Sequence, residues 1–163
     1  MNPAELSPGG FAQRVRRSVE KEGARILVID SLNGYLTAMP EEAFLTLQMH
    51  EVLTYLNQRG VVTLLILAQQ GILGAMPANV DVSYLTDNIV LLRFFEAAGE
   101  VRTAISVVKK RTSQHEHSIR EFKIGEPDGV RVGEPLTGFQ GVLTGIPEYT
   151  GDVLSLQKKV NER

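Results

Sequence analysis

The sequence predicts an α/β fold in which parallel strands with flanking helices precede an antiparallel β-hairpin appendage. Two apolar runs, residues 25–30 and 61–71, are separated by a helical pattern, which is typical of a strand–helix–strand unit with a parallel sheet. A third observation predicts the appendage, because two β-rich runs between residues 88 and 111 flank the turn residues 97–99.

Capping residues, proline and glycine predict where the helices of the α/β part begin and end. The first helix can be capped by Ser7 and starts with Pro8, and Gly23 follows its end. The second helix is expected over residues 41–58 and is closed by Gly60. Its buried face is expected to consist of Leu45, Met49, Val52, Leu53 and Leu56.

The apolar pattern of each predicted strand indicates how many of its faces are buried. The run 61–71 is almost continuously apolar, so both of its faces are expected to be covered. Shorter β-runs at 117–124 and 129–135 extend the antiparallel part. We expect residues 1–150 to form one domain and residues 151–163 to be a polar tail.

Composition excludes several classes of protein. The net charge of −2 over 163 residues gives no general attraction to nucleic acid or to an anionic membrane. The absence of cysteine excludes disulfides and thiolate metal sites and fits a reducing compartment. With no secretory signal and no apolar run long enough to cross a bilayer, the chain is expected to be soluble and cytoplasmic.

The strongest chemical signal is the acid that ends the first apolar run, in "ILVID" followed by Ser31. A carboxylate at the carboxyl end of a parallel strand lies where such sheets bind ligands, and Asp30 could there serve a Mg²⁺–nucleotide site. The structural alternative is that Asp30 ends the strand merely because Asp favours turns and helix starts.

Two further groups carry weaker signals. Gln69 and Gln70 end the next strand and could sense a γ-phosphate or orient water, although the spacing alone favours a pair of surface glutamines that opens a loop. Lys109 and Arg111 share one face of an extended strand and, with His115, suit an anionic group. The alternatives are an edge-protecting basic cluster or nucleic-acid binding, and the latter is disfavoured because stacking aromatics are missing.

Together these pieces are more specific than any one of them. The order "GARILVIDSLNGYL…LTYLNQRGVVTLLILAQQG…RTAISVVKKR…IREFKI…VGEPL…FQGVLTGIP" closely resembles the KaiC-like ATPases, RecA-fold proteins whose founding member is a circadian clock autokinase. The resemblance covers nearly the whole chain. It implies a partial RecA-like P-loop NTPase fold, corresponding to the C-terminal half of the ATPase domain.

The resemblance assigns roles to the candidate residues. Asp30 matches the Walker B aspartate that holds Mg²⁺, with Ser31 and Gln69 as nucleotide contacts and Gln70 as a sensor. Lys109, Arg111 and His115 match a K-x-R-x₃-H pattern that reaches the γ-phosphate of a neighbouring subunit. Ser83 and Tyr84 fall near the Ser-Thr pair that clock members phosphorylate, with Tyr in place of Thr.

The sequence also departs from a complete ATPase, because the dipeptide Gly-Lys of a GxxxxGK(S/T) phosphate loop is missing. The complete domain is expected to use ATP and Mg²⁺, whereas this chain alone is predicted to be inactive. Without the phosphate-loop strand, the strands at 61–68 and 87–95 must pair directly or leave hydrophobic edges exposed. The expected partners are therefore further copies, by strand exchange or ring assembly, or a separate N-terminal half-domain. The alternative function is an interaction module without nucleotide turnover.

Overall fold

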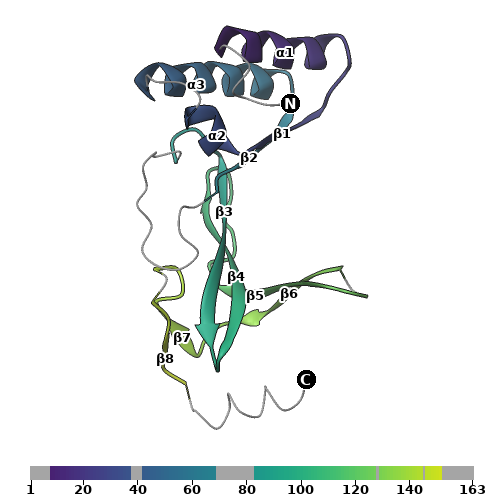
Figure 1. Ribbon diagram of the computed structural model, residues 1–163. Coiled ribbons are helices and arrows are strands. Elements are labelled where there is room, and N and C mark those ends of the chain that lie inside the picture. The colour runs from purple at the N-terminus through teal and green to yellow at the C-terminus, as the bar shows by residue number, and fades with distance from the viewer. Residues whose placement is uncertain (1–7, 38–41, 69–82, 128, 145, 152–163) are drawn as a thin grey trace. The chain divides into compact units, whose positions relative to one another are not determined.

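The computed structural model describes residues 8–37, 42–68, 83–127, 129–144 and 146–151, which belong to two compact units. The first unit spans Met1–Gln69 and the second spans Gln70–Arg163. Figure 1 labels their helices and strands. Among the described residues no helix is long and apolar enough to cross a membrane.

The first unit is an α/β unit with a parallel strand pair, as predicted. Its elements are α1 (Pro8–Glu20), β1 (Ile26–Asp30), α2 (Leu32–Thr37), α3 (Glu42–Gln58) and β2 (Val62–Ile66). In the parallel pair Ile26 lies opposite Val62 and Asp30 lies opposite Ile66. Gly60 adopts a φ of 67° after α3, a conformation that glycine adopts at helix C-termini.

The core of the first unit lies between the two long helices and one face of the strand pair, and Figure 1 shows α1 and α3 on the same side of β1 and β2. The buried residues are Val15, Val52, Leu56 and Val61. Phe11 and Val19 pack against them, so the residues at positions 11, 15 and 19, spaced four apart, form one apolar stripe on α1.

The other face of the strand pair is open among the described residues. Val62, Leu64 and Ile66 of β2 are each 44–58% exposed. Ile26 and Val28 of β1 are each more than half exposed. The prediction that both faces of this strand are covered is therefore wrong for the part of the chain that the structure describes. The apolar pattern indicates a cover that these residues do not supply.

The second unit is built on an antiparallel sheet. Its strands are β3 (Asn88–Ala97), β4 (Glu100–Lys110), β5 (Arg120–Gly125) and β6 (Gly129–Pro135), in the order β3-β4-β5-β6, followed by the short pair β7 (Phe139–Gln140) and β8 (Glu148–Tyr149). Ala98 and Gly99 both have positive φ, as a two-residue type I′ turn requires. The predicted hairpin is confirmed.

The two faces of the β3–β6 sheet differ. One, here called the packed face, buries Phe95, Ala97 and Ala104 against Val142. The ring of Phe139 meets Phe95 edge-on with 5.5 Å between centroids. The opposite face, here called the open face, carries exposed apolar side chains. The mixed α/β class is confirmed, and the described strands β2 and β3 belong to different sheets.

Candidate functional site

Asp30 is the last residue of β1 and lies opposite Ile66 near the end of β2. Its side chain is exposed, and the structure gives its carboxylate no ion pair or hydrogen bond among the described residues. Open α/β sheets bind their ligands at the carboxyl ends of the strands. The exposed carboxylate of Asp30 lies at such a position.

Ser31 has a local role next to Asp30. Its Oγ accepts a hydrogen bond of 3.4 Å from the backbone N–H of Gly34, so Ser31 caps the short helix α2. The peptide bond between Asp30 and Ser31 is cis. The other two residues predicted for this edge, Gln69 and Gln70, lie outside the described residues.

In the second unit Lys109 and Arg111 meet one turn. The Nζ of Lys109 donates to the carbonyl oxygens of Ser83 and of Thr86, the latter at 2.8 Å. Arg111 pairs with the carboxylate of Asp87, Nη1 to Oδ1 3.0 Å. Both cations are thus held against the segment 83–87, on one side of the strand end, as the strand spacing predicts.

A β-bulge determines which side this is. Val90 lies opposite Val107, but Ile89 lies opposite Lys109, so β4 carries one extra residue, Val108. Residues directly opposite one another share a face of the sheet, so Lys109 lies on the side of Ile89 and away from Val90. The bulge therefore turns Lys109 from the open face to the side of the packed face.

His115 follows the strand end. Its Nε2 is buried and has no hydrogen-bond partner among the described residues. Its ring lies 4.3 Å from that of His117, centroid to centroid. Glu116, which separates the two histidines in the sequence, accepts hydrogen bonds from Arg120 and Ser118. These bonds lower the pKa of the Glu116 carboxyl.

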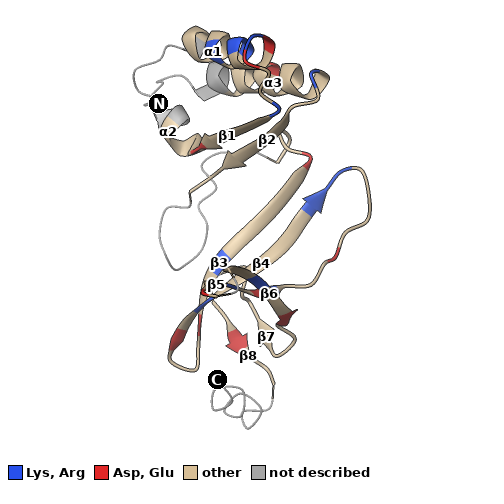
Figure 2. Ribbon diagram, turned by 90° about the vertical axis from the view of Figure 1, so that its right-hand side faces the viewer, with Lys and Arg blue, Asp and Glu red and all other residues tan. Residues whose placement is uncertain are grey.

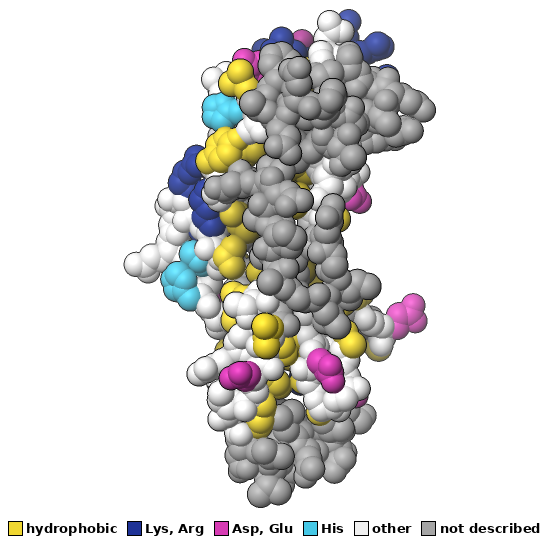
Figure 3. All heavy atoms as spheres, turned by 60° about the vertical axis from the view of Figure 1, so that its left-hand side comes forward, with side chains coloured by type: hydrophobic (Ala, Val, Ile, Leu, Met, Phe, Trp, Pro, Cys, Tyr) yellow, Lys and Arg dark blue, Asp and Glu magenta, His cyan; other side chains and the backbone are white. Residues whose placement is uncertain are grey.

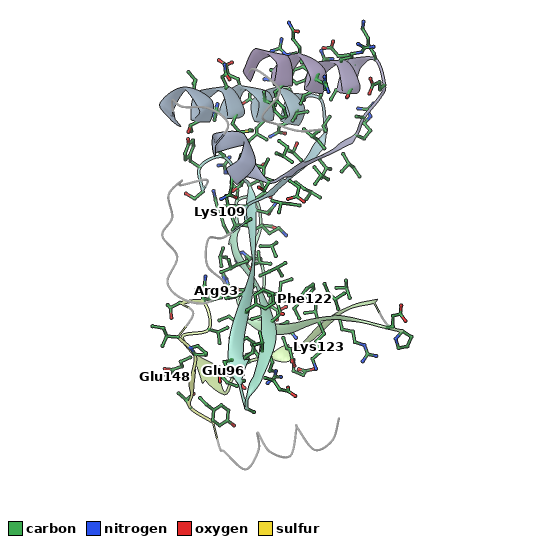
Figure 4. The ribbon with its side chains drawn as sticks, in the orientation of Figure 1. Arg93, Glu96, Lys109, Phe122, Lys123 and Glu148 are labelled. Atoms are coloured by element: carbon green, nitrogen blue, oxygen red, sulfur yellow. The ribbon has the colours of Figure 1, made fainter. Side chains whose placement is uncertain are left out.

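The charge distribution agrees with this description. Figure 2 shows the end of β4 in the blue of Lys and Arg, and Figure 3 shows Lys or Arg side chains and His side chains close together on the face in view. Figure 4 places Lys109 and Glu96 at opposite ends of the β3–β4 hairpin. The basic end of the hairpin is a surface on which an anion could bind.

The described residues contain no group of three or more His, Asp or Glu side chains that could hold a metal ion. Mg²⁺ is usually held by one or two carboxylates, water and phosphate oxygens. An exposed Asp30 fits that limited protein contribution.

An aspartate at the carboxyl end of a parallel strand lies where open α/β sheets bind their ligands. Residues 4–137 match the model of the family described as "ATPase: KaiC". The chain therefore belongs to the KaiC ATPase family, which confirms the resemblance seen in the sequence.

Individual relatives agree. The chain is 43% identical over 77 residues to the circadian clock protein KaiC3 of Synechocystis sp., which is 47% of this chain and 15% of that protein. It is 30% identical over 122 residues to the circadian clock oscillator protein KaiC of Synechococcus elongatus, which is 74% of this chain and 23% of the relative. The chain thus spans less than a quarter of the length of these relatives.

The sequence did not predict that Lys109 and Arg111 contact the segment 83–87. Asp87 was given no role, although it lies directly before β3 and pairs with Arg111. With a two-residue turn at Ala98 and Gly99 and regular pairing, Arg111 would lie opposite Thr86. The bulge shifts it to Asp87, and no feature of the sequence indicates the bulge.

Proposed function

We propose that this chain forms part of a KaiC-like ATPase domain with a RecA-like fold, within residues 1–150, and that Asp30 contributes a carboxylate to the Mg²⁺ that accompanies ATP. The observation that carries the proposal is the position of Asp30 at the carboxyl end of a parallel strand in a chain of this family. Bound Mg²⁺ would neutralise phosphate charge. Ser31 and Gln69 are the proposed nucleotide contacts and Gln70 the proposed sensor.

Lys109, Arg111 and His115 are proposed to act on the nucleotide of a neighbouring subunit in an oligomer. Two cations on one side of a strand end are suited to the charge that develops during phosphoryl transfer. The support is that Lys109 and Arg111 meet the same turn, with His115 following them in the chain. Ser83, which Lys109 contacts, is a proposed phosphorylation site together with Tyr84.

The proposed activity needs a phosphate loop that the sequence of this chain lacks. The test therefore uses residues 1–163 completed with a segment that carries a GxxxxGK(S/T) loop. Mg²⁺-dependent ATP hydrolysis is expected, and Asp30→Asn is expected to abolish it. Lys109→Ala and Arg111→Ala are expected to reduce it, whereas Lys110→Ala, a matched control on the next residue, is expected to leave it unchanged.

Action in trans has a sharper test. An Asp30→Asn subunit keeps its basic residues, and a Lys109→Ala subunit keeps its aspartate. Mixing the inactive Asp30→Asn protein with the impaired Lys109→Ala protein is expected to give more hydrolysis than the sum of the two separate proteins, because some interfaces then combine one intact nucleotide site with one intact basic group. Mixtures that are no more active than that sum would contradict the proposed role of Lys109.

A second candidate function is an interaction module that binds its partners without nucleotide turnover. The observation that favours it is the large apolar area exposed in both units. Calorimetric titration of the chain with Mg²⁺–ATP separates the two. Saturable binding favours the ATPase part, whereas absence of binding, both alone and after completion with the loop segment, favours the module.

A further inference from the structure

Two histidines lie next to each other in the segment that joins β4 to β5. This segment, residues 114–119, has no regular secondary structure and carries His115 and His117 on either side of Glu116. The centroids of the two imidazole rings are 4.3 Å apart, and the ring planes make an angle of 53°. Because both rings belong to one three-residue stretch, their proximity is a local property of the chain.

The ring of His115 has a nitrogen that no described residue uses. This atom, Nε2, is buried and has no hydrogen-bond partner among the described residues. A neutral imidazole nitrogen is either an N–H donor or a lone-pair acceptor, so leaving it buried and unpaired is costly. A ligand bound at Nε2 would remove this cost, and the imidazole of His117 lies close enough to bind the same ligand.

The separation of the rings is close to that of two imidazoles on one metal ion. A metal–nitrogen bond is about 2.0–2.1 Å long and the ring centroid lies about 1.1 Å behind the nitrogen, so each centroid is roughly 3.2 Å from the ion. Two such ligands, at an angle between about 90° and 109°, have centroids roughly 4.5–5.2 Å apart. The observed 4.3 Å is therefore near the lower limit, and a small rotation of the two side chains reaches the required geometry.

The backbone around the two rings is held in place. The carboxylate of Glu116 accepts a hydrogen bond of 2.8 Å from Nε of Arg120 and another from the hydroxyl of Ser118. The carbonyl oxygen of Ile119 accepts one of 2.8 Å from the N–H of Leu136, and the side chain of Ile119 packs against the core of the second unit. Ligands on a backbone that is already ordered bind an ion at a smaller cost in entropy.

The donor atoms determine which ions fit. Imidazole nitrogen suits Zn²⁺, Ni²⁺ and Cu²⁺, whereas Mg²⁺ prefers oxygen ligands. Glu116 is engaged by Arg120, and the part of the chain that the structure describes contains no cluster of three metal-binding side chains. An ion held by two imidazoles therefore keeps water at its other positions, and its site is weaker than a four-ligand zinc site.

We propose that His115 and His117 together bind one divalent transition-metal ion, of the class of Zn²⁺, Ni²⁺ and Cu²⁺. Half the protein ligands of a structural zinc site predict a dissociation constant on the order of 1–100 µM. This site differs from the proposed Mg²⁺ position, because Asp30 belongs to the other unit. It requires neither nucleotide nor a neighbouring subunit, so it is independent of the ATPase role proposed for His115.

Calorimetric titration of the chain with Zn²⁺, at about pH 7.5 and without a histidine tag, tests the proposal, since ligation needs neutral imidazole. One equivalent is expected to bind. His115→Gln and His117→Gln are each expected to raise the dissociation constant at least about tenfold, because each removes one of two ligands. His50→Gln is the matched control: it removes the third histidine of the chain, which lies on α3, and is expected to leave binding unchanged.

NMR of the imidazole nitrogens gives a readout that needs no substitution. Zn²⁺ is expected to shift the ring resonances of both His115 and His117 and to leave those of His50 in place, and Mg²⁺ is expected to shift none of them. Backbone amide spectra identify variants that fail to fold. The proposal is overturned if Zn²⁺ does not bind, if binding survives both glutamine variants or is lost in His50→Gln, or if the ring resonances of only one of the pair move.

Discussion

The guanidinium of Arg111 and the carboxylate of Asp87 form an ion pair, with Nη1 3.0 Å from Oδ1. The backbone N–H of Arg111 also donates to the carbonyl oxygen of Asp87 at 2.9 Å. The residue proposed to reach a phosphate is thus already paired with an anion of its own chain. An incoming phosphate has to compete with Asp87 for the same guanidinium.

The first prediction follows from this competition. Asp87→Asn removes the carboxylate charge and keeps the backbone pairing. The affinity of the chain for tripolyphosphate is expected to rise about two- to fivefold, because an exposed ion pair contributes about 0–1 kcal/mol. Isothermal titration calorimetry at low ionic strength measures it. Asp87→Glu, which retains the charge, is the control, and an unchanged affinity in Asp87→Asn would contradict the competition.

Much of the fold could be predicted from local patterns. The helix stripe of Phe11, Val15 and Val19, and the apolar runs of β1 and β2, are short-range signals, and the structure agrees with them. The cover of β2 could not be predicted, because it depends on contacts between segments far apart in the sequence. An apolar face only indicates that some partner covers it and does not identify that partner.

The candidate site was predictable in part. Asp30 followed from an apolar run that ends in an acid, and the structure puts it at the end of β1. The surroundings of Arg111 could not be predicted from the sequence, because one extra residue in β4, Val108, changes which side chains of β3 and β4 lie opposite one another. The roles of these residues stay predictions.

The second prediction concerns the turn of the β3–β4 hairpin. Ala98 has a φ of 55°, in the left-handed region that costs a residue with a Cβ about 1–2 kcal/mol. Asparagine tolerates this region, and Asn-Gly is a favoured type I′ pair. Ala98→Asn is therefore expected to raise the free energy of unfolding by about 1 kcal/mol, measured by urea denaturation. Ala98→Val is the opposite control, and a lower stability in Ala98→Asn would show that the turn is of another type.

The third prediction concerns the pair between Arg102 and Glu121 on neighbouring strands. The guanidinium makes two contacts with the carboxylate, Nη2 to Oε2 2.7 Å and Nε to Oε1 2.8 Å, and both side chains are about 15% exposed. Removing one partner leaves a desolvated charge, so Glu121→Leu is expected to cost about 2–3 kcal/mol of unfolding free energy.

A double variant isolates the pair from the rest of the sheet. Arg102→Met with Glu121→Leu removes both charges, and its cost is expected to be smaller than that of either single variant. Arg102 also lies over the ring of Phe95, 5.7 Å from the centroid, so some loss from Arg102→Met is expected to remain. Additive costs would show that the two side chains act independently.

The fourth prediction concerns pH and the carboxyl of Glu116. Hydrogen bonds from Arg120, and then from Ser118, lower its pKa below the ordinary 4.5. A lowered pKa in the folded state means that the carboxylate stabilises the fold above about pH 4.5, and that this contribution is lost as the pH falls through the lowered pKa. Arg120→Met is expected to return the pKa toward its ordinary value, which an NMR titration of the side chain measures.

The same variant gives the stability readout. Above pH 4.5 Arg120→Met is expected to be less stable than the original chain, and the difference is expected to shrink below that pH as Glu116 becomes protonated in both proteins. Arg120 also donates to the carbonyl oxygen of Gly133 at 3.0 Å, and that part of the loss does not depend on pH. Glu116→Gln is the matched control, since it removes the titrating group and keeps an acceptor for Arg120. If the difference between the original chain and Arg120→Met stays constant from pH 7 to the acid limit, Glu116 is not the group that Arg120 stabilises.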